Sequence, residues 1–114
     1  MILEDDEATA ELIRFYLQEE GLEVTISSKG EGFVERVAAL KPDLITLDVL
    51  LPDTNGFSVF AELQADERTR DIPVVFITVK EGDREKGIKM GARGYVVKPF
   101  KELDLKTTIH SILG

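Results

Sequence analysis

The sequence alternates short apolar runs with amphipathic segments, five times in succession along its 114 residues. The apolar runs predict strands over residues 1–3, 22–26, 44–47, 72–77 and 95–97. The amphipathic segments predict helices over residues 8–20, 33–40, 57–65, 83–90 and 103–113. Strands that alternate with helices pair in parallel through right-handed crossovers, and helices then cover both faces of the sheet. The pattern therefore predicts a single doubly wound α/β domain over residues 1–114.

The apolar residues also indicate which face of each element is buried. Residues 44–47 and 72–77 are apolar almost throughout, as in strands covered on both faces. Residues 22–26 alternate apolar with polar side chains, which indicates a half-buried strand before a turn at 27–30. Helical spacings predict three inward stripes: Leu12, Ile13, Tyr16 and Leu17 in the first helix; Phe57, Phe60, Ala61 and Leu63 in the third; Leu105, Ile109 and Ile112 in the last. In the second helix the apolar residues are Phe33, Val34, Val37, Ala38 and Leu40.

Composition excludes several classes of function. The chain has no cysteine, which rules out disulfides and cysteine-based zinc sites, and its single histidine, His110, argues against a Ser-His-Asp triad. A net charge of −8, with 14 scattered basic residues, argues against direct binding to nucleic acid. No apolar run approaches the roughly 20 residues that a membrane helix needs. No secretion signal is visible, so a cytoplasmic location is the expectation.

Polar residues that follow or end the predicted strands form the candidate site. Glu4 and Asp5, Asp48, Thr78 and Lys98 all stand at carboxyl ends of strands, which meet at one edge of a parallel sheet. Carboxylates crowded there repel one another unless a cation compensates, and Mg²⁺ prefers such oxygen ligands. Lys98 could contact a phosphoryl oxygen, and Thr78 supplies a hydroxyl. Asp48 is the candidate nucleophile, because carboxylates can form aspartyl-phosphate.

Each of these residues also has a structural interpretation when it is taken alone. Asp6 or Glu7 can cap the helix that follows, and Asp48 can simply end its strand. Thr78 fits an ordinary strand threonine and Lys98 a solvated lysine. Tyr95 fits a core residue, and His110 fits a surface or packing role without partners. The functional interpretation depends on the occurrence of these residues together in one chain.

Five pieces of the sequence, in this order and spacing, resemble the receiver domain of two-component response regulators over essentially the whole chain. They are Ile2-Leu3-Glu4-Asp5-Asp6-Glu7; Pro42-Asp43-Leu44-Ile45-Thr46-Leu47-Asp48 with Leu51-Pro52-Asp53 and Gly56; Ile72-Pro73-Val74-Val75-Phe76-Ile77-Thr78; Gly91-Ala92-Arg93-Gly94-Tyr95; and Lys98-Pro99-Phe100. The resemblance implies a flavodoxin-like three-layer α/β/α sandwich, with five parallel strands in the order 2-1-3-4-5 and five helices.

The resemblance also implies a role for each site residue. Asp48 matches the phosphoacceptor, which receives a phosphoryl group from a sensor histidine kinase or phosphotransfer domain. Glu4 and Asp5, rather than Asp5 and Asp6, match the acidic pair that binds Mg²⁺ together with Asp48 and the backbone carbonyl of Leu50. Thr78 and Lys98 match the hydroxyl and the ammonium that bind the phosphoryl group. Such a domain catalyses its own phosphorylation and slow dephosphorylation and is not otherwise an enzyme.

Further implications concern the switch. Tyr95 matches the aromatic residue whose rotamer follows the threonine, turning inward when Thr78 moves toward the phosphoryl group. The surface of the fourth helix, fifth strand and fifth helix is then reshaped for an output domain or partner, or for a homodimer. The Lys98–Pro99 peptide bond is expected to be cis.

Three features depart from the family's pattern. The first strand has only three residues before Glu4, and we expect this shortness to weaken it. Only 19 residues separate Thr78 from Lys98, fewer than usual, which bears on the length or register of the fourth helix. Val79 stands where a smaller residue is usual, and with the apolar Leu50 we expect it to narrow access to Asp48 and alter the rates of phosphorylation and hydrolysis.

Three other functions make different demands on the sequence. A pseudo-receiver would use the same fold only for binding or dimerisation. A phosphatase of the haloacid-dehalogenase type needs a second aspartate two positions after the nucleophile, where this chain has Leu50. A nucleotide-binding fold lacks support, because no glycine-rich loop follows the first strand.

Overall fold

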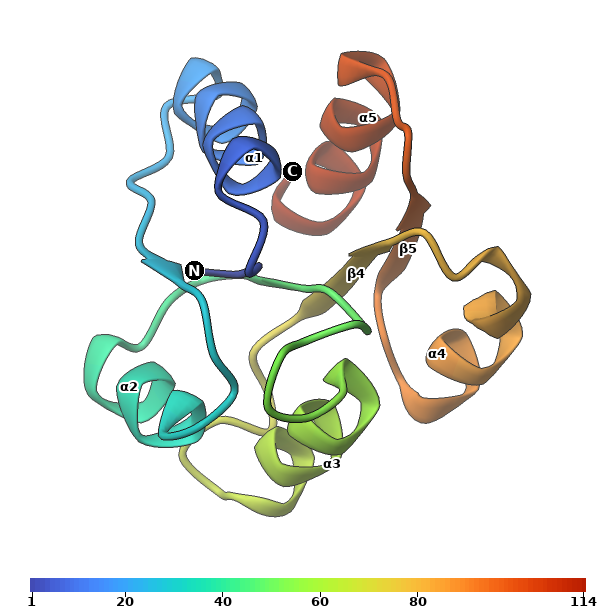
Figure 1. Ribbon diagram of the computed structural model, residues 1–114. Helices are drawn as coiled ribbons and strands as arrows, with labels where there is room; N and C mark the ends of the chain where they lie inside the picture. The colour runs from blue at the N-terminus through green and yellow to red at the C-terminus, as the bar shows by residue number, and fades with distance from the viewer.

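The computed structural model describes all residues from 1 to 114 and shows five parallel strands in the order β2-β1-β3-β4-β5 (Figure 1). The strands are β1 (Ile2–Leu3), β2 (Ile26–Ser27), β3 (Ile45–Leu47), β4 (Val74–Thr78) and β5 (Gly94–Val97). The predicted flavodoxin-like topology is confirmed. Sequence-based boundaries lie within two residues of the observed ones for every strand except β2 and for every helix.

The helices form two layers, one on each face of the sheet. They are α1 (Glu7–Glu19), α2 (Phe33–Leu40), α3 (Gly56–Ala65), α4 (Arg84–Met90) and α5 (Glu102–Leu113). Figure 1 shows α1 and α5 together on one side of the sheet and α2, α3 and α4 on the other. No helix combines the length and apolar character needed to cross a membrane.

The core is divided by the sheet, because successive strand side chains point to opposite faces. In β4, Phe76 is fully buried toward the α2–α3–α4 side, where its ring centroid lies 5.0 Å from Phe57, 5.6 Å from Phe60 and 5.8 Å from Tyr95. The neighbouring residue Val75 packs into the α1–α5 side instead. The near-continuous apolar character of β4 follows from these two cores.

The prediction for β2 is wrong in extent. Leu22 and Val24 are half-buried, as their alternation indicates, but only Ile26 and Ser27 form the strand. Their partners in β1 are Ile2 and Leu3. Because β1 contains only these two residues, β2 forms strand hydrogen bonds with it over two residues only. Ser27 consequently belongs to the strand and not to the turn.

Three apolar residues of the predicted helices lie outside the buried faces. Leu12 in α1 and Leu40 in α2 are more than two-fifths exposed, and Ala61 in α3 is exposed while Val59 is buried. Adjacent helical residues differ by about 100° around the axis, so Ile13 can face the sheet only if Leu12 faces away. Periodicity alone does not decide which of two neighbouring apolar residues is inside.

The fourth helix is short, in line with the reduced spacing between Thr78 and Lys98. A 3₁₀ turn, η1 (Glu81–Asp83), precedes α4, which has only 7 residues. Gly87 is its buried residue, and the helix packs against β5.

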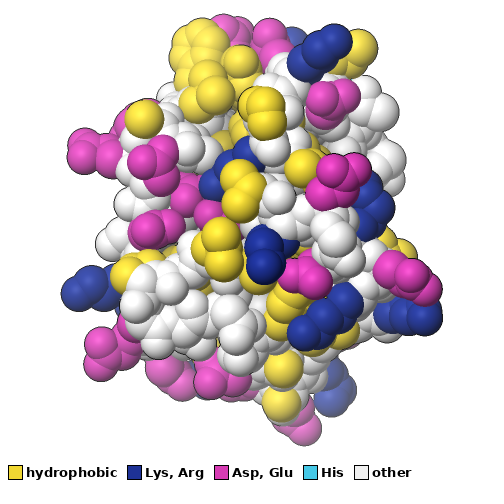
Figure 2. Space-filling model, turned by 45° about the vertical axis from the view of Figure 1, so that its right-hand side comes forward, with side chains coloured by type: hydrophobic (Ala, Val, Ile, Leu, Met, Phe, Trp, Pro, Cys, Tyr) yellow, Lys and Arg dark blue, Asp and Glu magenta, His cyan; other side chains and the backbone are white.

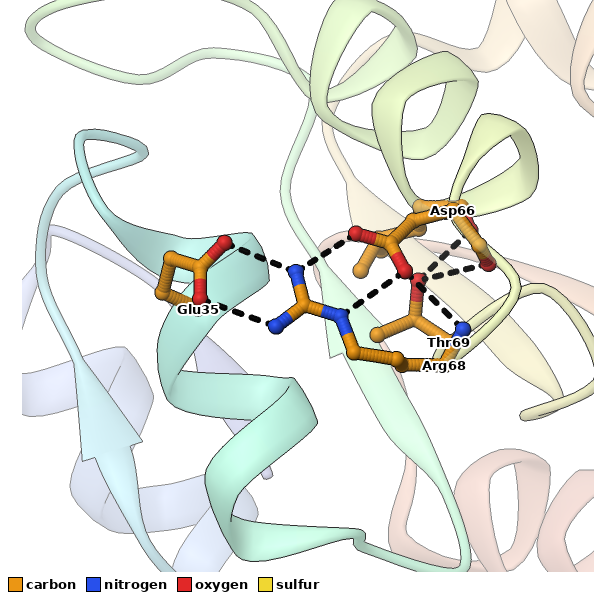
Figure 3. A network of polar contacts seen from close by, with 5 residues as sticks. Glu35, Asp66, Arg68 and Thr69 are labelled. Atoms are coloured by element: carbon orange, nitrogen blue, oxygen red, sulfur yellow. Dashed lines mark hydrogen bonds and ion pairs between the residues drawn. The ribbon is translucent and has the colours of Figure 1, made fainter.

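A polar network ties α2 to the loop after α3 (Figure 3). The Arg68 guanidinium donates to both Glu35 carboxylate oxygens, at 3.0 and 2.7 Å, and to the Asp66 carboxylate. The hydrogen bonds from Arg68 lower the pKa of Asp66 to about 2. Thr69 is buried beside them and donates its hydroxyl to the Leu63 carbonyl at 2.6 Å. The loop after α3 is thus folded back on that helix.

Candidate functional site

Four strands bring the candidate residues to one edge of the sheet. Glu4 directly follows β1, Asp48 follows β3 and Lys98 follows β5, while Thr78 is the last residue of β4. The strands are parallel, with Leu3 beside Leu47 and Thr78 beside Val97, so their carboxyl ends lie together.

Three carboxylates cluster at this edge. Glu4, Asp5 and Asp48 each place an oxygen within 4.8 Å of the other two. Glu4 and Asp48 are buried, whereas Asp5 is exposed. Carboxylate oxygens around an open position suit Mg²⁺, which keeps several waters in its coordination shell. The donor chemistry of the cluster therefore fits a magnesium ion.

Lys98 links two of these carboxylates. Its Nζ donates to Glu4 Oε1 at 2.5 Å and to Asp48 Oδ2 at 2.9 Å. The other Asp48 oxygen, Oδ1, accepts a hydrogen bond from the Leu50 backbone N–H at 3.1 Å. The Lys98 ammonium and the Leu50 backbone N–H therefore each orient one oxygen of the Asp48 carboxylate.

The electrostatics of the cluster show an excess of negative charge. Burial raises the pKa of Glu4 to about 7, with a further increase from the Asp48 charge, although the hydrogen bond from Lys98 opposes it. Burial acts to lower the pKa of Lys98, but its bonds to Glu4 and Asp48 outweigh that effect and raise it. One ammonium does not fully compensate three acids, so a bound cation would be stabilised here.

Thr78 and Tyr95 lie on the neighbouring strands β4 and β5. Thr78 is fully buried, and its hydroxyl accepts a hydrogen bond from the Lys80 backbone N–H at 3.3 Å. Tyr95 donates its hydroxyl to the Lys80 backbone carbonyl. Burial, and then the charge of Asp83, raise the pKa of Tyr95. The backbone of Lys80 therefore contacts both residues.

The loop between β3 and α3 holds Asp48 in place through close backbone contacts. A Cβ on Gly56 would lie 2.2 Å from the Asp48 carbonyl oxygen, so only glycine fits there. Asp53 accepts hydrogen bonds from the backbone N–H groups of Gly30 and Glu31, at 3.0 and 2.8 Å, which joins this loop to the one after β2.

The remaining predictions concern the cap of α1, the Lys98–Pro99 peptide bond and the apolar residues beside the site. Asp6 caps α1 by accepting from the Thr9 backbone N–H at 3.0 Å, which confirms the capping interpretation for that residue. The Lys98–Pro99 peptide bond is cis. Val79 and Leu50 are about half exposed beside the site.

Sequence reasoning missed several contacts. His110 was assigned no partner, yet its Nε2 lies 2.7 Å from Glu20 Oε1. Sequence reasoning also missed two residues that contact Tyr95. Arg84 donates to the Tyr95 backbone carbonyl at 2.8 Å, and Gly87 lies against the Tyr95 ring. A glycine within a helical pattern was the available signal for Gly87, because glycine is less favourable than alanine in a helix interior.

Comparisons with known proteins agree on one family. The family model described as "Response regulator receiver domain" matches residues 1–110. The transcriptional regulatory protein CssR of Bacillus subtilis is 32% identical over 114 residues, which are 98% of this chain and 49% of that protein. The chain spans about half the length of the curated relatives it matches.

Two solved structures extend this likeness to three dimensions. The receiver domain of the sensor histidine kinase PA1611 from Pseudomonas aeruginosa has a TM-score of 0.88 at 30% identity, covers 99% of this chain and 94% of its own, and has a magnesium ion coordinated in its active site cleft. The BeF3-activated N-terminal receiver domain of RstA from Klebsiella pneumoniae has a TM-score of 0.87 at 27% identity, with coverages of 98% and 95%.

Proposed function

The chain belongs to the response regulator receiver domain family of two-component systems, and from this membership we propose that Asp48 accepts a phosphoryl group from a histidine kinase or phosphotransfer domain. The observation that supports this proposal most is the position of Asp48. It is buried within a cluster of three carboxylates, and its Oδ2 accepts a hydrogen bond from the Lys98 ammonium, which also binds Glu4. An isolated strand-end aspartate would need none of these neighbours.

In the proposed reaction, an Asp48 carboxylate oxygen attacks the phosphorus of a phosphohistidine. The new P–O bond forms as the P–N bond breaks, and the leaving imidazole nitrogen takes a proton from solvent. Lys98, whose Nζ lies 2.9 Å from Asp48 Oδ2, would contact the phosphoryl oxygens after transfer. Positioning and charge neutralisation supply most of the barrier lowering in such transfers. Slow hydrolysis of the aspartyl-phosphate by water would reset the domain.

Glu4, Asp5 and Asp48, together with the backbone carbonyl of Leu50, would hold Mg²⁺. When bound, the ion supplies positive charge that offsets the charge of the phosphoryl oxygens. The chain's own residues orient the acceptor: Leu50 N–H and Lys98 Nζ each bind one Asp48 oxygen. Val79 and Leu50, both exposed beside the site, would restrict the approach of water.

Phosphorylation adds roughly −1.5 to −2 charge at Asp48. In the proposed switch, the Thr78 hydroxyl gives up its bond with the Lys80 N–H and binds the phosphoryl group. Because Lys80 also accepts from the Tyr95 hydroxyl, a movement of Thr78 reaches Tyr95 through one backbone segment. The α4–β5–α5 surface would then change for a reader domain or partner.

Several partner assignments are part of the proposal. Ile88 on α4 and Leu103 on α5 are exposed apolar residues on the surface that would form a homodimer. Figure 2 shows, on this side of the molecule, basic side chains interspersed with acidic ones rather than gathered in one patch. With a net charge of −8, residues 1–114 would form one domain that signals without contacting nucleic acid itself.

Mass spectrometry after incubation with acetyl phosphate and Mg²⁺ tests the proposal. We expect the mass to increase by one phosphoryl group, and Asp48→Asn to remain unmodified under the same conditions. An unmodified parent protein would favour the alternative of a pseudo-receiver that serves only for binding or dimerisation.

Size-exclusion chromatography with and without beryllofluoride tests the homodimer, and equal elution volumes would argue against it.

A further inference from the structure

The Tyr95 side chain is held in an inward position by the backbone of Lys80 and by α4. It is only 5% exposed, and its ring packs on Phe76 with the centroids 5.8 Å apart. Its hydroxyl donates to the Lys80 carbonyl at one end. At the other end Arg84 donates to its backbone carbonyl, and the Arg84 guanidinium lies 5.5 Å from the ring centroid. Figure 1 shows α4 alongside β5, where these contacts form.

Gly87 is the α4 residue against which the ring rests. A Cβ at this position would lie 3.0 Å from Tyr95 Cδ2, 3.2 Å from Tyr95 Cε2 and 3.3 Å from Phe76 Cδ2. Carbon atoms in favourable contact lie about 3.5–4.0 Å apart, so one methyl group would already crowd the ring.

The helical backbone does not itself require glycine at this position. Gly87 has no positive φ, and glycine is unfavourable in a helix interior compared with alanine. The residue is therefore explained by the space that it leaves and not by its conformation.

We propose that Gly87 is a positioning residue, whose missing side chain admits the Tyr95 ring to the inward position. A side chain at residue 87 competes with the ring for the same volume, so the residue sets the balance between inward and outward Tyr95. This inference deepens the proposed function and rests on it in one respect, namely that the inward position accompanies phosphorylation of Asp48.

Tyrosine fluorescence can test the geometric part without any phosphoryl group. The chain has no tryptophan and two tyrosines, so Tyr16→Phe leaves Tyr95 as its sole fluorophore. In this background, Gly87→Ala should increase acrylamide quenching of Tyr95 toward that of a solvent-exposed tyrosine. Gly82→Ala is the matched control, because a Cβ on Gly82 meets nothing within 4 Å and should leave quenching unchanged. Equal quenching in folded Gly87→Ala and parent proteins would overturn the inference.

A double-mutant cycle separates this role from a general effect on α4. With Tyr95 present, Gly87→Ala combines the helix preference for alanine with crowding of the ring. In a Tyr95→Ala background the crowding by the tyrosine ring is gone and only the Phe76 contact remains, so the same substitution should become clearly more favourable in urea unfolding. The same change in the urea midpoint in both backgrounds would show that Gly87 acts only through helix propensity and would contradict the proposal.

Binding of beryllofluoride with Mg²⁺ tests the link to the phosphorylation site. If the inward state is the one that binds the phosphoryl analogue, the apparent dissociation constant of Gly87→Ala should rise as the inverse of the inward fraction that remains. An unchanged constant, alongside increased quenching, would overturn the regulatory role. Failure of the parent itself to bind would count against the proposed function, and the quenching result would still decide the role of Gly87.

Discussion

Lys98 Nζ lies 2.5 Å from Glu4 Oε1, although the two residues are 94 positions apart in the sequence. Glu4 comes from the end of the interior strand β1 and Lys98 from the end of the edge strand β5, so their contact spans β3 and β4. Asp48, at the end of β3, binds the same ammonium. The carboxylates and the ammonium therefore form one coupled site, and a change in any one of them should alter the others.

Asp5→Asn should stabilise the protein without magnesium and remove the stabilisation by magnesium. The substitution takes one charge from three clustered carboxylates, and because Asp5 is exposed the gain should be at most about 1 kcal/mol. In the parent protein, added Mg²⁺ should raise the melting temperature because it binds only the folded cluster. Thermal unfolding with and without Mg²⁺ measures both effects. A Mg²⁺ response that survives in Asp5→Asn would remove Asp5 from the proposed ligands.

Gly56→Ala should destabilise the fold and misplace Asp48. The new Cβ would lie 2.2 Å from the Asp48 carbonyl oxygen and 2.9 Å from its carbonyl carbon, and these backbone atoms cannot move independently of the site. Overpacking of this kind costs about 1–3 kcal/mol and sometimes more. Urea unfolding gives the stability, and the rate of reaction with acetyl phosphate gives the effect on Asp48. A parent-like rate and stability would contradict the close approach.

Thr69→Val and Thr46→Val should change stability in opposite directions. Thr69 donates its buried hydroxyl to the Leu63 carbonyl, so its loss should cost about 1 kcal/mol. Thr46 is also buried, but its hydroxyl has no partner, so valine should stabilise the protein, by up to about 1–3 kcal/mol. Chemical denaturation of both variants tests this contrast. Equal effects would mean that hydrogen bonding does not distinguish the two threonines.

Asp66→Asn should reduce the loss of stability in acid. Hydrogen bonds from Arg68 lower the pKa of the folded-state carboxyl from 3.8 to about 2, so Asp66 binds its proton more weakly in the folded protein. Its contribution is therefore complete above pH 3.8 and is lost as the pH falls toward about 2. Melting temperatures measured across this range should fall less steeply for the variant. Arg68→Leu should flatten the profile similarly, and a slope that neither substitution changes would argue against this ion pair.

Much of the fold was predictable because it depends on local periodicity. Consecutive apolar residues over 72–77 predict a strand covered on both sides, and β4 is buried throughout. The length of β2 was not predictable in the same way, since it depends on where Ile2 and Leu3 pair with it. Leu12 was misassigned for a related reason: its neighbour Ile13 took the inward position when α1 packed on the sheet.

The sequence by itself determined the alternation of strands and helices, the parallel topology and the residues at each strand end, because these follow from short-range pattern and chain connectivity. Only the tertiary structure decided that Lys98 binds Glu4 and Asp48 together, that Lys80 contacts both Thr78 and Tyr95, and that Gly87 leaves room for the Tyr95 ring. These relationships depend on distances of a few ångströms between distant segments, which arise only when the helices pack on the twisted sheet.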